Sequence, residues 1–251
     1  MNQPASFGRF NILPPVVKNL LIINGLFFLG SFIVGNRFGV DVFHLLGLHY
    51  WTSEGFKPYQ IVTHMFMHGD LGHILSNMFA LWMFGSVLEN FWGGKRFLIY
   101  YFVTGLGAAI IHNLTKAIDI YNLSQMLDPT VLATVKNEGY AVILRGEEVF
   151  TNPVAEALNR AINTPTVGAS GAVFGILLAF GMLFPNTLLY LYFAIPIKAK
   201  YFVIAYGAFE LFQGLRNDPG DNIAHFAHLG GMLFGFLLIK YWNKNNRKSF
   251  Y

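Results

Sequence analysis

Residues 168–184 read GASGAVFGILLAFGMLF, an apolar run whose one hydroxyl, on Ser170, lies close to its start. A helix of about 20 apolar residues crosses the hydrocarbon core of a bilayer, so this run predicts a membrane-spanning helix. A serine at a helix start is commonly an N-cap or a small packing residue. The GxSxG pattern of a hydrolase elbow is also incomplete, because Ala172 replaces its last glycine. By itself the stretch therefore indicates a membrane protein and leaves the role of its serine open.

The composition of the whole chain agrees with a membrane protein. Hydrophobic residues make up 54% and charged residues 12% of the 251 residues, whereas about 25% of an ordinary soluble domain is charged. Because so little charge cannot cover a water-facing surface, lipid must cover much of the chain. The chain has no cysteine, which excludes disulfides, thiolate chemistry and cysteine-based zinc sites. Its net charge of +4 is modest, and we expect no nucleic-acid partner.

Six apolar stretches are candidates for membrane-spanning helices. They cover residues 15–34, 71–91, 97–111, 168–184, 201–212 and 224–242. A further apolar stretch, 188–197, is short and contains Pro196, so we interpret it as an interfacial or re-entrant connection rather than a span. The pattern predicts an all-α, polytopic membrane protein built as a six-helix bundle.

Basic residues are distributed unevenly between the loops. With the N-terminus inside, the inner segments contain Arg9, Lys18, Lys95, Arg96, Lys198, Lys200, Lys240, Lys244, Arg247 and Lys248, with almost no acidic residues. The outer loops contain Arg37, Lys57 and Arg216, balanced by Asp41, Glu54, Asp70, Asp218 and Asp221. The positive-inside rule therefore predicts a cytoplasmic tail at 1–13 and a membrane domain from 14 to 251. Both termini would lie in the cytoplasm, in a bacterial inner membrane.

A polar stretch interrupts this domain between the third and fourth predicted helices. It covers residues 114–165, far more than a usual connection. Residues 153–162 have the period of an amphipathic helix, with Ala155, Leu158 and Ile162 on one face. We interpret the stretch as an extramembrane insertion on the outer side.

Residues 227–231 read AHLGG and open the sixth predicted helix. A single histidine at this depth is often a hydrogen-bonded structural residue. However, Gly171 and Gly175 form a GxxxG pattern on one helix, and Gly231 and Gly235 form another. Such small faces let two helices approach closely. His228 shares the face of the second pattern, so contact between the two faces would bring it toward Ser170, as a base and its nucleophile require.

A third polar cluster opens the second predicted helix and contains His64, His68, Asp70, His73 and Asn77. His73 and Asn77 are four residues apart and share a helical face, from which their N–H groups could stabilise an oxyanion. His64 and His68 are also four apart, which raises a metal site, but the glutamate of an HExxH motif is replaced by Met65. From the residues alone, structural, metal-binding and oxyanion roles remain equally open.

Three motifs together resemble the rhomboid family of intramembrane serine proteases. They are GASG at 168–171, AHLGG at 227–231, and HGDLGHILSNMFALWMFG at 68–85, which leads to Glu89. The resemblance extends through all six predicted helices and omits the tail and the insertion.

The resemblance implies that Ser170 is the nucleophile and His228 its base, a dyad with no third carboxylate in view. His73 and Asn77 would supply oxyanion donors, alongside the backbone N–H of Ser170. Phe174 stands where the family often has a tyrosine stacked beneath the catalytic histidine. The supporting glycines would be Gly168, Gly171, Gly231 and Gly235.

Other positions are implied to lie outside the chemistry. Glu89 matches a structural carboxylate near the inner end of the second helix, and His68 lies near the site. His225 lies just before the base and has no assigned role. Many members carry a Trp-Arg pair where this chain has Tyr59-Gln60, which affects the expected packing of the loop after the first helix.

The implied reaction is peptide-bond hydrolysis near the outer membrane surface, without a cofactor or metal. Its partners would be transmembrane protein substrates with helix-breaking residues near the cut, and the lipid bilayer. The fifth helix and residues 216–222 are candidates for a lateral gate, by analogy. Alternatives are a transporter or channel, an inactive rhomboid-like protein that binds membrane clients, and a metalloprotease.

Overall fold

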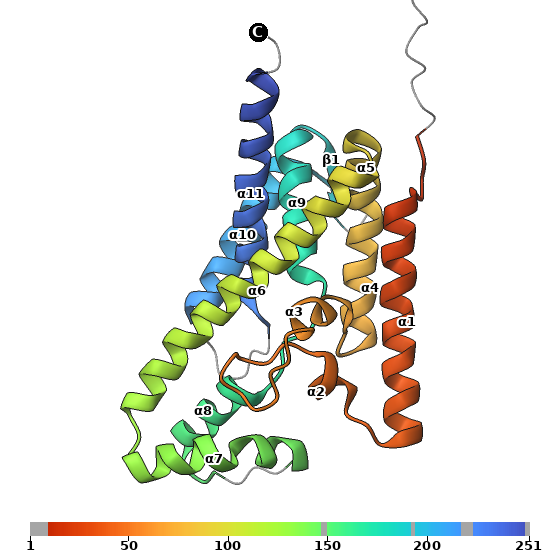
Figure 1. The fold of residues 1–251 in the computed structure, drawn as a ribbon. Helices are drawn as coiled ribbons and strands as arrows, with labels where there is room; N and C mark the ends of the chain where they lie inside the picture. Colours follow the sequence, from red (N-terminus) through yellow and green to blue (C-terminus); the bar gives the residue numbers. More distant parts are fainter. Residues whose placement is uncertain (1–9, 147–149, 192–193, 217–222, 249–251) are drawn as a thin grey trace, which may run out of the picture.

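The computed structural model describes residues 10–146, 150–191, 194–216 and 223–248, which form a bundle of helices with one small hairpin (Figure 1). The helices are α1 (Pro15–Phe38), α2 (Val42–Leu46), α3 (Gln60–Thr63), α4 (Leu71–Ala80), α5 (Ser86–Trp92), α6 (Gly94–Gln125), α7 (Pro129–Arg145), α8 (Pro153–Asn163), α9 (Ser170–Leu183), α10 (Ala199–Arg216) and α11 (His225–Lys248). A 3-10 turn, η1 (His64–Phe66), and a π-helical segment, η2 (Leu81–Gly85), complete the helical part. The predicted all-α class is confirmed.

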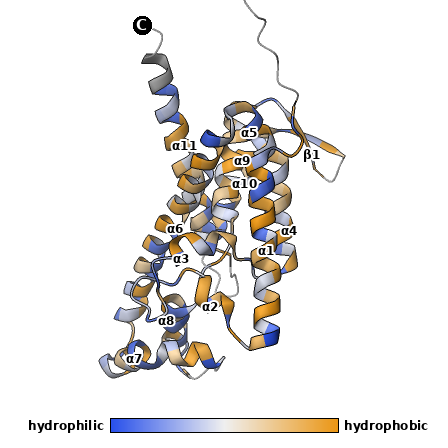
Figure 2. Cartoon of the chain, turned by 45° about the vertical axis from the view of Figure 1, so that its right-hand side comes forward, coloured by the Kyte–Doolittle hydropathy of each residue, from blue (hydrophilic) through white to orange (hydrophobic). Residues whose placement is uncertain are grey.

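The predicted membrane helices are present at the expected places. Among the residues that the structure describes, three segments are long and apolar enough to span a bilayer: Pro15–Phe38, Leu71–Trp92 and Gly94–Gln125. The shorter apolar helix α9 and the helices α10 and α11 complete the six positions. Figure 2 shows apolar residues concentrated on these helices, whereas α8 and much of α7 are more polar. This arrangement confirms a polytopic six-helix bundle.

The second span is one continuous segment made of α4, η2 and α5, and its C-terminal end supports α1. The buried carboxylate of Glu89 accepts the backbone N–H groups of Val16 at 3.0 Å and Val17 at 2.8 Å. These N–H groups belong to the first turn of α1, which has no side-chain cap of its own. Glu89 is therefore a structural carboxylate, as the resemblance implies, and it joins the second span to the first.

The third span is longer than predicted. Hydropathy placed its end near residue 111, but α6 continues without a break to Gln125, so residues 114–125 belong to this helix and not to a separate insertion. Helical hydrogen bonding does not require lipid, and the extension packs Ile120 and Leu123 against α7 and α8. Those contacts partly bury apolar side chains of the extension.

The remainder of the insertion forms a small packed unit. Helices α7 and α8 lie at the end of the molecule opposite to the C-terminal end of α11 (Figure 1). The predicted amphipathic helix is confirmed as α8, whose residues Ala155, Leu158 and Ile162 are buried in a cluster of their own. The unit contacts the segment after α1, where the hydroxyl of Ser53 donates to Asn163 Oδ1 at 2.7 Å.

The segment between α1 and α4 is ordered by a buried glutamine. The side-chain amide of Gln60 donates to the carbonyl oxygens of Leu45 at 3.2 Å and Gly55 at 3.0 Å. Its Oε1 accepts the backbone N–H of Lys57 at 3.0 Å. A neutral amide thus holds this loop together.

The apolar stretch 188–197 is a β-hairpin and not a span. Strands β1 (Leu188–Leu191) and β2 (Ile195–Lys198) pair in antiparallel fashion, with Leu188 opposite Lys198. The hairpin connects α9 to α10. This confirms that the stretch is a connection.

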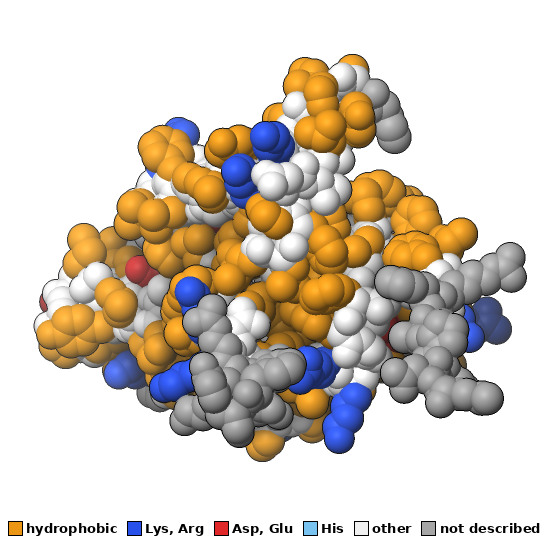
Figure 3. Space-filling model, turned by 90° about the horizontal axis from the view of Figure 1, so that it is seen from above, with side chains coloured by type: hydrophobic (Ala, Val, Ile, Leu, Met, Phe, Trp, Pro, Cys, Tyr) orange, Lys and Arg blue, Asp and Glu red, His pale blue; other side chains and the backbone are white. Residues whose placement is uncertain are grey.

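One end of the bundle is basic. Figure 3 views the molecule from the end at which α11 finishes, and Lys and Arg side chains far outnumber acidic ones in this view. By position in the chain, Lys95 and Arg96 begin α6, and Lys200 begins α10. The uneven loop charges thus gather at one end, opposite to α7 and α8. That this end faces the cytoplasm remains a prediction, and Arg9, Asp218, Asp221 and most of the tail at 1–13 lie outside the described residues.

Candidate active site

Ser170 is the first residue of α9 and is positioned by the glycine two residues earlier. Gly168 has a φ of +132°, a conformation that favours glycine. Its N–H donates to the carbonyl oxygen of His64 at 2.9 Å, which fixes the turn. A Cβ built on Gly168 would lie 2.9 Å from Nε2 of His73 and 3.5 Å from Oγ of Ser170. Both side chains therefore lie on the same side of Gly168.

Helices α9 and α11 touch through their first glycines, as the paired patterns predicted. A Cβ on Gly231 would overlap the carbonyl oxygen of Gly171, and a Cβ on Gly171 would lie 3.7 Å from the carbonyl oxygen of Ala227. The two backbones are therefore in direct contact beside Ser170 and His228. This contact joins the first turn of α9 to the first two turns of α11.

The second glycine of each pattern does not take part in that contact. Gly175 faces the side chain of Thr104, and Gly235 faces the hydroxyl of Tyr100, both on α6. The expectation that both patterns pack along one shared face is wrong for this half. The reason is that α6 fills the space between the diverging helices, where the hydroxyl of Tyr100 also donates to the carbonyl oxygen of Gly175 at 2.8 Å.

His228 is buried and held in two directions. Its ring lies over the ring of Phe174, with centroids 4.0 Å apart and 6° between the planes. Its Nδ1 lies 2.8 Å from Oε2 of Glu210 on α10. Within the described part of the chain, no hydrogen bond joins its Nε2 to another residue. This nitrogen therefore remains available to a further partner.

Glu210 was missed in the sequence, where no third carboxylate was in view, although it lies next to His228. It is 3% exposed, and Oε2 also lies 2.7 Å from Nδ1 of His225, the first residue of α11. A signal was present, because an ionisable residue inside an apolar span is by default a functional candidate. His225, to which no role was assigned, belongs to the same cluster.

The cluster on the second span has a clear local order. The carboxylate of Asp70 caps α4 by accepting the N–H of His73 at 2.8 Å. The rings of His68 and His73 meet edge to face at 4.9 Å. The buried amide of Asn77 donates to the carbonyl oxygen of His73 at 3.0 Å, and its second N–H remains for another acceptor. His73 and Asn77 thus share one helical face, with His73 beside Ser170.

The metal interpretation of this second-span cluster gains no support. Among the described residues, the group of side chains close enough to hold a metal ion consists of Glu210, His225 and His228. His64 instead has Nδ1 2.8 Å from the carbonyl oxygen of Gln60, within its own segment.

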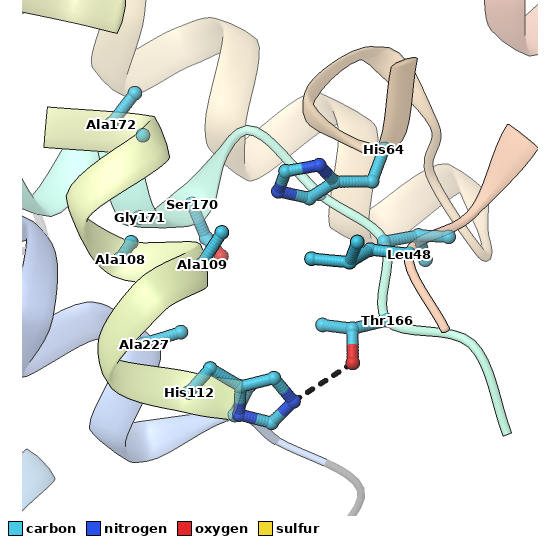
Figure 4. A pocket seen from close by; sticks show the side chains of 14 residues that line it. Leu48, His64, Ala108, Ala109, His112, Thr166, Ser170, Gly171, Ala172 and Ala227 are labelled. Carbon is cyan, nitrogen blue, oxygen red and sulfur yellow. Dashed lines mark hydrogen bonds between the residues drawn. The ribbon is translucent and has the colours of Figure 1, made fainter. Parts of the chain in front are cut away.

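A pocket lies beside Ser170, between α6, α9 and the segment that leads into α9 (Figure 4). It has about 380 Å³ of space, part of it open to the outside. Most of its wall is apolar, but His64, His112, Thr166 and Ser170 contribute polar atoms, and Nε2 of His112 lies 2.8 Å from Oγ1 of Thr166. Polar groups around such a space can hold water next to the hydroxyl of Ser170.

Residues 55–244, which include every residue of the candidate site, match the family model of the Rhomboid domain. The chain is 29% identical to RHOMBOID-like protein 12, mitochondrial, of Arabidopsis thaliana, covering 86% of this chain and 55% of that protein. It is 26% identical to Rhomboid protease AarA of Providencia stuartii, covering 69% and 52% of the two chains. It is also 26% identical to Rhomboid-like protease 3 of Toxoplasma gondii, covering 80% and 58%. The chain therefore spans about half the length of the curated relatives it matches.

Proposed function

This chain belongs to the rhomboid family, and we propose that it is an intramembrane serine endopeptidase in which Ser170 is the nucleophile and His228 the general base. The observation that carries the proposal is the contact between α9 and α11 at Gly171 and Gly231. Because this contact lies close to Ser170 on α9 and to His228 on α11, it supports a site shared by the hydroxyl and the imidazole. The free Nε2 of His228 is then the atom that takes the proton of Ser170.

The proposed reaction has two steps. The Oγ of Ser170 attacks the carbonyl carbon of the scissile bond while Nε2 of His228 takes the hydroxyl proton. The imidazolium gives that proton to the leaving amine as the C–N bond breaks, which leaves an acyl-enzyme. Water then attacks the ester, His228 accepts the proton of that water and returns it to Ser170, and the acid product leaves.

The negative charge that develops on the carbonyl oxygen needs donors that are already in place. His73 is proposed as one of them, because its Nε2 and Oγ of Ser170 lie on the same side of Gly168. Asn77 is proposed as the second, through the N–H that its helix leaves unused. The backbone N–H of Ser170 lies at the start of α9, where helical hydrogen bonding leaves it without a partner in its own helix.

The substrates are proposed to be transmembrane segments of other membrane proteins. A helix hides its carbonyl groups in its own hydrogen bonds, so a segment with helix-breaking residues near the cut is favoured. Helix α10 stays a candidate for the side through which such a segment enters, whereas residues 217–222 of that proposed gate lie outside the described residues.

The protein is proposed to have both termini in the cytoplasm, because the basic end of the bundle contains the beginning of α6 and the end of α11. A bacterial inner membrane remains the proposed location. Matched relatives from Arabidopsis thaliana and Schizosaccharomyces pombe are named as mitochondrial proteins.

The test is cleavage of a model transmembrane substrate by the purified chain in detergent micelles, with Ser170→Ala beside it. We expect the wild type to cut and Ser170→Ala to be inactive. Cleavage by Ser170→Ala would contradict the assignment of Ser170 as the nucleophile. Equal inactivity of both proteins, with substrate still bound, would favour a client-binding or transport role instead.

A further inference from the structure

Glu210 is a carboxylate inside an apolar helix. It lies in the C-terminal half of α10, among residues that match the predicted span 201–212, and it is 3% exposed. An ionised carboxylate at such a place is costly unless it is paired. Here it is paired twice, because Oε2 lies 2.8 Å from Nδ1 of His228 and 2.7 Å from Nδ1 of His225. Both distances are typical of charge-assisted hydrogen bonds.

The two contacts determine where the histidine protons reside. An ionised carboxylate can only accept hydrogen bonds, so each Nδ1 that approaches Oε2 has to carry a hydrogen. In the neutral imidazole of His228 this leaves the lone pair on Nε2. That is the tautomer in which Nε2 can accept the proton of Ser170.

Helix α10 also supports the ring of His228 from a second direction. Phe174 lies flat against that ring and also contacts Tyr206, with centroids 4.9 Å apart. Tyr206 is four residues before Glu210, so both lie on the face of α10 that turns to the site. The imidazole is therefore held by a ring against its plane and by a carboxylate at its edge.

We propose that Glu210 is a positioning residue that extends the pair of Ser170 and His228 to a triad. This inference rests on the proposed protease function. Glu210 holds His228 in the reactive tautomer and orientation, and its charge stabilises the imidazolium that forms when the proton leaves Ser170. The carboxylate itself neither gains nor loses a proton. His225, bound to the same oxygen, holds the carboxylate against the first turn of α11.

The competing explanation is a metal site formed by the side chains of Glu210, His225 and His228. Their ligand atoms all lie within 4.8 Å of one another. The geometry favours direct hydrogen bonds, because one oxygen already lies within hydrogen-bonding distance of both ring nitrogens. A metal ion between these atoms would require them to move apart. The experiment therefore includes a test for a metal requirement.

The decisive variant is Glu210→Gln, made in the full chain and assayed in micelles. It keeps the size of the side chain but removes its charge. We expect kcat to fall at least about 100-fold with little change in KM, since substrate binding does not involve Glu210. The rate at which a fluorophosphonate labels Ser170 should fall in parallel, because that rate reports activation of the hydroxyl without a peptide substrate. Glu210→Asp should recover part of both losses.

Glu89→Gln is the matched control, because Glu89 is also a buried carboxylate in a span but supports α1. We expect it to lower thermal stability while the folded protein keeps the kcat of the wild type. A Glu210→Gln variant that keeps the kcat and labelling rate of the wild type overturns the inference while the protease assignment stands. A wild type that neither cleaves nor labels overturns the protease assignment itself.

Two further measurements keep the inference testable if Glu210→Gln does not fold. The ¹⁵N spectrum of histidine-labelled wild type should show His228 protonated on Nδ1 and not on Nε2, and the opposite tautomer overturns the inference. Activity that is lost to EDTA and restored by zinc also overturns it, in favour of a metal site.

Discussion

The ring of Phe174 lies parallel to the imidazole of His228, with 6° between the planes and 4.0 Å between the centroids. The contact places an aromatic face beneath the proposed base. When the base becomes an imidazolium, that face also attracts its positive charge. A phenylalanine meets both needs without the hydroxyl that the family often has here.

Phe174→Leu should therefore lower kcat by about tenfold, since a stacked aromatic or cation–π contact contributes about 0.5–2 kcal/mol. Phe174→Tyr should keep nearly full activity because the stacking ring remains. Steady-state cleavage of a transmembrane substrate by the three proteins checks this. A leucine variant as fast as the wild type would show that the stack has no catalytic value.

Gly231→Ala should abolish cleavage and lower the melting temperature, because its Cβ would overlap the carbonyl oxygen of Gly171 and push α11 from α9. Gly30→Ala on α1 is the matched control, since a Cβ there meets nothing within 4 Å. Its activity should equal that of the wild type. Thermal unfolding and cleavage assays of both variants test the helix contact, and full activity of Gly231→Ala would contradict it.

Gly168→Ala should reduce activity more than stability. A non-glycine residue in such a strained conformation costs about 1–3 kcal/mol, and the new Cβ would lie 2.9 Å from Nε2 of His73. Gly39→Ala separates the two effects, because Gly39 also has a positive φ, of 63°, but nothing lies within 4 Å of its Cβ. Both variants should melt earlier than the wild type, and Gly168→Ala alone should lose kcat. Equal kcat values in the folded variants would refute the crowding argument.

His73→Ala and Asn77→Ala should each lower kcat by about 10²–10³-fold, the usual cost of removing one oxyanion donor. The double variant should lose less than the product of the two, because both donors act on one oxygen. Ser76→Ala is the control on the same helix, since its hydroxyl is exposed and bonds only to its own turn. A higher KM with an unchanged kcat in His73→Ala would instead assign His73 to substrate binding.

Acid should destabilise the loop after α1. Burial, with the neighbouring imidazole of His44, lowers the pKa of His49 from 6.5 to about 4. Because the folded chain binds this proton more weakly than the unfolded chain, its contribution to stability is full above pH 6.5 and decreases as the pH falls toward 4. Below that pH the loss levels off.

Melting curves between pH 7 and pH 4 check this, with His49→Gln as the comparison. The melting temperature of the wild type should fall more steeply than that of the variant. Other buried histidines, such as His64, titrate in both proteins and cancel in the difference. Parallel curves for the two proteins would exclude His49 as the titrating group.

Hydropathy located the six helices well because an apolar run has to match the thickness of a bilayer. It failed at α6, whose end was expected near residue 111 but lies at Gln125. Hydropathy indicates where the apolar, lipid-facing residues end. The helix itself ends where its backbone groups no longer form helical hydrogen bonds. The packing of Ile120 and Leu123 on α7 and α8 stabilises the extension of α6 beyond residue 111.

The local motifs identified Ser170, His228, His73 and Asn77 as candidates, because the spacing of histidines, amides and glycines along one helix can be read directly from the chain. The sequence by itself therefore determined the class of the protein, the helices and the proposed reacting groups. Only the tertiary structure decided which helix faces meet. It separated Gly175 and Gly235, each of which packs on α6, and it brought Glu210 to His228. The reason is physical: the rotation of α10 about its own axis depends on its packing against α9 and α11, and no linear spacing within one helix encodes contact with another.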